Sequence, residues 1–152
     1  MTLFNALAVS ATGMTSNRLW IDLIANNIAN VNSIKPNGDP YQRKLPIFSE
    51  MVKELDSEVE SQMADFDFGK DPVKEIGAGV QTYKVLADNA PFKFVYEPGN
   101  PYADKNGFVK KSNVEVINEM VDMIAANRAY DASVQIANAA KAMVNKALEI
   151  GK

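Results

Sequence analysis

The chain has 152 residues, with no cysteine, no histidine and a formal net charge of −3. Lacking both residue types, it can form no disulfide, no thiolate zinc site and no Ser-His-Asp triad. Its net negative charge argues against electrostatic binding of nucleic acid over a broad surface. No apolar run is long enough to span a bilayer.

The distribution of proline divides the chain into three parts. All seven prolines lie between residues 36 and 101, so both ends are free of the strongest helix breaker. We therefore predict a mainly α protein with a small β part. Long helices in residues 1–32 and 112–152 pair as an antiparallel coiled coil, and residues 33–111 form an irregular middle segment with a β-hairpin.

The N-terminal helix is predicted over residues 3–31, and it would be about 40 Å long at the helical rise. Positions three and four residues apart are mostly apolar and define one seam, interrupted by a single arginine. The seam comprises Phe4, Leu7, Ala11, Met14, Arg18, Ile21, Ala25 and Ile28.

The middle segment alternates turn signals with short strands. Residues 41–48 are predicted to be extended, residues 50–62 weakly helical and the acidic, glycine-containing residues 63–79 a loop. Residues 80–86 and 92–96 are predicted to be two short strands, and the second shows the two-residue alternation of a half-buried strand. Residues 98–101 form a turn, and Asn106-Gly107 is a pair that favours a tight hairpin.

The C-terminal helix is predicted over residues 112–150, and Ser112 and Glu115 have the spacing of a capping box. One heptad seam is broken only by Glu119 and Ser133; it comprises Val116, Met123, Ala126, Tyr130, Ala137, Ala140, Val144 and Ala147. A second apolar stripe lies beside it and comprises Ala129, Ile136, Met143 and Ile150. Two stripes exceed what one partner helix covers, so we expect this helix to contact other chains as well.

Asparagines crowd the end of the N-terminal helix. Asn26, Asn27, Asn30 and Asn32 lie among apolar residues, although asparagine is a poor helix former. Their carboxamides could bond neighbouring subunits and fix register, as a buried asparagine does in a coiled coil. The alternative is a fraying helix end where asparagine is simply tolerated.

The start of the C-terminal helix carries a further apolar face, formed by Ile117, Met120, Val121 and Ile124, beside the charged Glu119, Asp122 and Arg128. The simpler interpretation is a solvated surface above a core stripe.

A carboxylate enzyme is a third interpretation, since Asp65, Asp67, Asp71 and Glu75 could supply an acid and a base. These four lie in a polar, glycine-containing stretch with no apolar pocket to raise a pKa, so we expect a solvated loop.

Two segments together resemble the flagellar rod and hook axial-protein family. They are DLIANNIANVN at residues 22–32 and SNVEVINEMVDMIAANRAYDASVQI at residues 112–136. The stretch YEPGNPYADKNGFV at residues 96–109 is similar to the corresponding stretch in the branch of that family that forms the proximal rod.

The resemblance implies a structural subunit of the bacterial flagellar basal body that polymerises into a helical tube and transmits torque. It implies partners in copies of the chain, other rod proteins and the flagellar type III export apparatus, and a place in the periplasmic rod. We expect this chain to lack an ordinary secretory signal, and that expectation suits this export route. The alternatives are another rod or hook axial subunit, or a non-flagellar coiled-coil adaptor.

We therefore predict no catalytic activity, cofactor, metal, nucleic-acid partner or membrane span. The side chains predicted to lie at subunit interfaces are Phe4, Leu7, Met14, Ile21, Ile24, Asn26, Asn27, Ile28, Asn30, Ile117, Met120, Met123, Ile124, Tyr130, Ala137, Ala140, Met143 and Val144.

Overall fold

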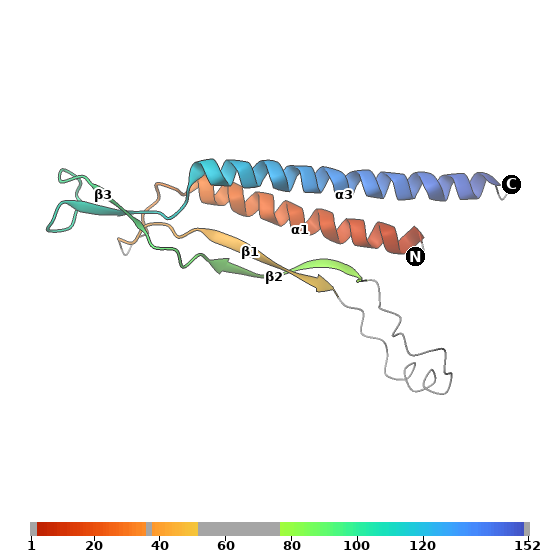
Figure 1. The fold of residues 1–152 in the computed structure, drawn as a ribbon, viewed down its shortest axis with the longest axis horizontal. Helices are drawn as coiled ribbons and strands as arrows, with labels where there is room; N and C mark the ends of the chain where they lie inside the picture. The colour runs from red at the N-terminus through yellow and green to blue at the C-terminus, as the bar shows by residue number, and fades with distance from the viewer. Residues whose placement is uncertain (1–2, 36–37, 52–76, 151–152) are drawn as a thin grey trace, which may run out of the picture.

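Two long helices form the body of the molecule. The computed structural model describes residues 3–35, 38–51 and 77–150. Helices α1 (Leu3–Ala29) and α3 (Val116–Ile150) pack side by side and run in opposite directions, so both chain ends lie at the same end of the molecule (Figure 1). The predicted mainly α architecture with a small β part is confirmed, whereas coiled-coil packing between the helices stays a prediction.

The face that α1 buries is not the predicted apolar seam. Its fully buried residues are Ser10, Ser16, Ile24 and Asn27. Of the seam, Leu7, Ala11, Arg18 and Ala25 are exposed, and Met14, Ile21 and Ile28 are only half-buried. Small and polar side chains let neighbouring elements approach closely: a Cβ built on Gly13 would lie 3.1 Å from Ser133 Oγ of α3. Most of the apolar seam therefore lies outside this packing face, although Ile24 is buried in it.

The heptad seam of α3, in contrast, faces inward. Glu119, Ala126 and Ala140 are fully buried, and the other seam positions up to Val144 are half-buried. Ala147 is exposed, in the last turns where α3 extends beyond the start of α1 (Figure 1). Both residues that interrupt the apolar pattern, Glu119 and Ser133, therefore belong to the packed face.

The predicted capping box at Ser112 is wrong. Helix α3 begins at Val116, and its first intrahelical bond runs from Glu119 N to the Glu115 carbonyl. The Ser112 hydroxyl instead accepts from Val114 N at 3.2 Å, while the Glu115 carboxylate accepts from Asn118 Nδ2. Ser112 thus closes a local turn that precedes the helix by about one turn.

In the described part of the middle segment, the strands form two antiparallel pairs. Strand β1 (Lys44–Met51) pairs with β2 (Gly79–Ala87), with an irregularity between Ile47 and Phe48. Strand β3 (Lys93–Tyr96) pairs with β4 (Phe108–Lys111). The strands predicted at 80–86 and 92–96 are confirmed, and the extended stretch predicted at 41–48 forms β1 a few residues later. The helical tendency predicted for 50–62 falls mostly outside the described residues.

The β3–β4 hairpin differs from its prediction in the turn. Asn106-Gly107 lies at the end of a long connection that carries residues 97–107, rather than in a two-residue hairpin loop. Gly107 donates to the Asp104 carbonyl and has a φ of +80°, so it ends a local turn. The hairpin extends beyond the helical pair at the end opposite the chain termini, and it contacts no other described helix or strand (Figure 1).

Candidate assembly surfaces and the polar cluster that orients them

Asn27 of α1 bonds the open edge of β1. Its Nδ2 donates to the Lys44 carbonyl at 2.9 Å, and Lys44 N donates back to its Oδ1 at 3.0 Å. The side chain therefore pairs with the strand as another strand would, on the side away from β2. Tyr41 OH also donates to Asn27 Oδ1 at 3.0 Å. Asn27 is 1% exposed, so these bonds form in a site without competing water.

Glu119 of α3 completes this arrangement. Asn27 Nδ2 donates to Glu119 Oε2 at 3.1 Å, and the Arg43 guanidinium donates to Glu119 Oε1. Arg43 also pairs with Asp122 at 3.0 Å and lies 3.8 Å from Asp88. A buried carboxylate needs such partners, because an isolated charge in the interior is strongly unfavourable.

Asn113 joins the segment before α3 to the ends of both β1 and β2. Its Oδ1 accepts from Arg43 N at 2.8 Å, and its Nδ2 donates to the carbonyls of Asp88 and Ala90. We call Asn27, Tyr41, Arg43, Asp88, Asn113, Glu119 and Asp122 the polar cluster. It fixes α1, α3 and the β1–β2 pair relative to one another at the end from which the hairpin leaves.

The charges of the polar cluster alter two pKa values. Burial raises the pKa of Tyr41, and the Glu119 carboxylate raises it further. Burial alone would lower the pKa of Arg43, but the hydrogen bond to Glu119 and the charges of Glu119, Asp122 and Asp88 raise that pKa above its ordinary value. Both groups therefore keep their usual charge state at neutral pH, and Arg43 serves as a fixed positive centre.

A second set of hydrogen bonds joins the other end of the β1–β2 pair to α1. Val80 N donates to Thr12 Oγ1 at 3.2 Å, and Ser16 Oγ donates to the Val80 carbonyl at 3.4 Å. Gly79 makes this approach feasible, because its φ is +124° and a Cβ there would clash with Thr12 Oγ1. Side chains of α1 thus bond the backbone of both strands.

The other asparagines of the predicted motif behave differently from Asn27. Asn30 Nδ2 donates to the Asn26 carbonyl and to Asn26 Oδ1, and Ser33 Oγ donates to Asn30 Oδ1. Asn30 thus bonds locally around the end of α1, whereas Asn26 Oδ1 also accepts from Tyr41 OH of the polar cluster at 3.3 Å. The carboxamide of Asn27 is occupied within the chain, a role that the sequence did not predict.

The predicted interface residues fall into two groups. Exposed on the single chain are Leu7, Asn26, Ile117, Met120, Ile124 and Met143. Half-buried or buried are Met14, Ile21, Ile24, Asn27, Ile28, Asn30, Met123, Tyr130, Ala137, Ala140 and Val144. The side chain of Phe4 lies outside what the structure describes. The acidic residues considered for catalysis, Asp65, Asp67, Asp71 and Glu75, also lie outside the described residues.

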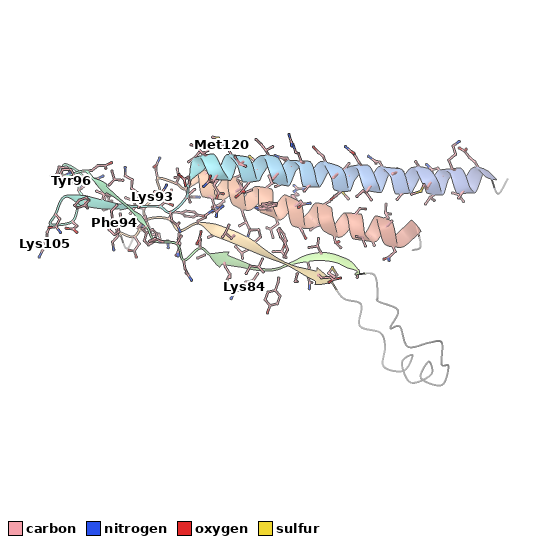
Figure 2. All side chains as sticks on the ribbon, in the orientation of Figure 1. Lys84, Lys93, Phe94, Tyr96, Lys105 and Met120 are labelled. Carbon is pink, nitrogen blue, oxygen red and sulfur yellow. The ribbon has the colours of Figure 1, made fainter. Side chains whose placement is uncertain are left out.

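An uncovered apolar face lies at the start of α3. Ile117 is 73% exposed, and Met120, Val121 and Ile124 are each more than half exposed. We call these four residues the α3 apolar face. Met120 lies on the outer side of the first turns of α3, away from α1 and the strands (Figure 2). Monomeric soluble proteins rarely leave such contiguous apolar side chains uncovered, so this face is a candidate assembly surface.

The sequence did not predict a role for Tyr41 or Arg43 in the site, and Glu119 was expected on a solvated surface. A signal was present: a glutamate that breaks an otherwise apolar heptad seam must either leave the packed face or bring a partner with it. The chain contains only three arginines, and Arg43 follows the proline-rich exit from α1. The spacing of residues along the chain gave no means of choosing Arg43 as that partner.

Two kinds of feature, clusters that could hold a metal ion and helices that could span a membrane, were sought in the parts of the chain that the structure describes. No group of three or more acidic side chains there is arranged to hold a metal ion. None of the described helices is long and apolar enough to cross a membrane.

Comparison with known proteins identifies relatives along the whole chain. Residues 105–150 match the family described as "Flagellar basal body rod FlgEFG protein C-terminal". The flagellar basal-body rod protein FlgC of Bacillus subtilis is 37% identical, and the alignment covers 100% of both chains. FlgC of Borreliella burgdorferi is 39% identical over 99% of this chain and 98% of its own. FlgC of Salmonella typhimurium is 34% identical over 100% of both chains.

Proposed function

The chain belongs to the family of flagellar basal-body rod proteins FlgC, and from that premise we propose that it polymerises through its terminal helices into a helical tube that transmits torque. Members of this family are structural proteins of the flagellum and not enzymes. The basal body is therefore where the chain acts, in assembly with other rod components. The resemblance found in residues 22–32, 96–109 and 112–136 is confirmed.

The observation that carries the proposal is the α3 apolar face. The polar cluster already holds α1, α3 and the β1–β2 pair together, so Ile117, Met120, Val121 and Ile124 are not required for that purpose. Burying an apolar side chain of this size stabilises an interface by about 1.5–3 kcal/mol. Repeated in every copy of a helical assembly, contacts of this size favour polymer strongly over free subunit.

We propose that the helices of neighbouring subunits meet as coiled-coil contacts. Residues of α1 that face away from the polar cluster, such as Leu7, would join that contact. Asn26 is exposed, with its Oδ1 accepting from Asn30 and Tyr41, and remains a candidate for hydrogen bonds between subunits through its Nδ2. We further propose that the chain occupies the periplasmic part of the rod and travels there through the flagellar type III export apparatus, as the family resemblance implies.

Replacing part of the α3 apolar face in a motile bacterium tests the proposal. The variant Met120→Ser/Ile124→Ser, expressed in a strain that lacks its own copy, should fold normally but fail to enter rods and leave cells non-motile. The matched control is Asn127→Ser, which changes an exposed polar residue on the same helix and should be tolerated. Normal rods and motility in the double variant would contradict assembly through this face.

A further inference from the structure

The β3–β4 hairpin is joined to the body of the molecule by two short segments of chain. Residues 88–92 lead from β2 into β3, and residues 112–115 lead from β4 into α3. We call these two segments the junction. Of the residues in β3 and β4, only Val109 is buried, and the hairpin extends away from the helices (Figure 1). The direction of the hairpin therefore depends largely on how the junction is held.

The side chain of Asn113 links the two segments of the junction to each other. Its Nδ2 donates to the Asp88 carbonyl at 3.1 Å and to the Ala90 carbonyl at 3.2 Å. Its Oδ1 accepts from Arg43 N at 2.8 Å, at the start of β1. A carboxamide both donates and accepts, so one side chain can bond three backbone groups in this way. Asn113 thereby ties the segment before α3 to the segment before β3 and to the body.

Two other contacts at the junction hold the hairpin less firmly. Lys93 on β3 and Glu115 before α3 form an ion pair at 3.6 Å, but both side chains are about half exposed, and exposed ion pairs contribute little. Gln42 Nε2 donates to the Asp88 carbonyl at 2.8 Å, at the end of the segment nearer to β2. Ala90 lies closer to β3 along the chain. The bond from Asn113 to the Ala90 carbonyl is therefore the one that reaches toward the hairpin.

A cleft between the base of the hairpin and the turn after α1 leaves room for movement. It has a volume of about 200 Å³. The turn lines it with Val31, Ser33 and Pro40, and the hairpin side lines it with Glu97, Lys111 and Ser112. A segment with few buried contacts opens at a low cost in free energy, and an open cleft does not oppose its movement as a packed interface would. Without a restraint at the junction, the hairpin can therefore tilt toward this turn.

We propose that Asn113 is a positioning residue that sets the direction of the β3–β4 hairpin relative to the helices. With its three bonds in place the hairpin extends beyond the helical pair in one direction, and without them it tilts across the cleft. The inference concerns the single folded chain, so it does not rest on the proposed function. An arm that is already held in one direction loses little conformational freedom when it meets a partner, which favours binding.

Distances between pairs of spin labels on the purified full-length chain test the proposal. The chain has no cysteine, so two introduced cysteines carry the labels. One pair joins Lys105→Cys, toward the tip of the hairpin (Figure 2), to Asn127→Cys on α3. The reference pair joins Ala8→Cys on α1 to the same position on α3. All three positions are exposed, and pulsed electron paramagnetic resonance gives the distribution of distances for each pair.

In the Asn113→Ala variant, the distribution between hairpin and α3 should broaden and shift, while the distribution between α1 and α3 stays as it was. Asn113→Asp keeps an oxygen acceptor for Arg43 N but loses both N–H donors, so it should broaden the hairpin distribution too, and it replaces an alanine variant that does not fold.

The matched control is Asn89→Ala, which removes an exposed asparagine from the same junction and should change neither distribution. An unchanged hairpin distribution in either folded variant at position 113 would overturn the proposal. Equal broadening of both distributions would also overturn it, because Asn113 would then hold the whole fold together and not the hairpin in particular.

Discussion

The polar cluster and the α3 apolar face lie within two turns of each other on α3, yet they use their side chains in opposite ways. Glu119 is fully buried and bonded to Asn27 and Arg43, whereas its neighbour Met120 is more than half exposed. The inner side of the helix is held by directional polar contacts, and the outer side keeps apolar side chains uncovered. At the start of α3, hydrogen bonds thus fix the inner side of the helix, whereas the apolar side chains on its outer side are left for neighbouring subunits to bury.

The largest effect on stability is expected from replacing Glu119, the buried carboxylate of the polar cluster. Glu119→Leu should lower the free energy of unfolding by about 3–5 kcal/mol, because it leaves Arg43 and Asn27 without their buried partner. Urea unfolding of the purified chain, followed by circular dichroism, measures the change. The control is Glu149→Leu, which removes an exposed ion pair with Lys146 and should cost less than about 1 kcal/mol. Equal effects of the two changes would show that the cluster does not hold the fold.

A smaller loss is expected at the amide that pairs with β1. Asn27→Leu removes four hydrogen bonds and leaves the N–H and carbonyl of Lys44 without these partners. We expect a loss of about 2–3 kcal/mol, in keeping with buried groups left unsatisfied. Asn26→Leu, one residue away but exposed, removes only a long bond from Tyr41 at 3.3 Å and a bond from Asn30, and should lose less than half of this. If the two leucine variants unfold at the same urea concentration, Asn27 does not act as described.

A still smaller loss of stability is expected where the other end of the β1–β2 pair approaches α1. Gly79→Ala forces a side chain into the left-handed region and against Thr12, at a cost of about 1–3 kcal/mol. Gly99→Ala provides the control, since nothing lies within 4 Å of a Cβ at that position. Thermal unfolding compares the two variants. A Gly79→Ala chain as stable as the Gly99→Ala chain would exclude the close approach of β2 to α1.

Local sequence signals predicted the order of the helices and strands, but they did not predict the polar cluster. Prolines confined to the middle and apolar seams at both ends predicted two long helices, and two short strand-like runs predicted β2 and β3. The face that α1 packs within the chain is not its apolar seam, because Ser10 and Ser16 are buried there in place of larger apolar residues. Close packing of backbones depends on both partners, so one helix alone cannot reveal it. Asn27 and Glu119 meet across 92 residues of sequence, and no spacing rule links them to each other or to Arg43.

The smallest effect on stability is expected on the α3 apolar face. Val121→Ser should change the free energy of unfolding by less than about 0.5 kcal/mol, because the side chain is already exposed. The same change should reduce the amount of the subunit recovered in isolated rods, since each copy would lose apolar contact with a neighbour. Quantitative blotting of rod fractions against whole cells measures this. A variant that is strongly destabilised yet assembles normally would reverse the contrast between the two faces.

The central claim is that the outer face of α3 is reserved for other subunits. A map of the chain within isolated basal bodies, at a resolution that shows side chains, tests it most directly. We predict that Ile117, Met120 and Ile124 lie within about 4.5 Å of apolar atoms of a neighbouring subunit, while the bonds of Asn27 and Glu119 persist within each chain. A map in which these three side chains face solvent, or in which Glu119 pairs with another subunit, would contradict the account.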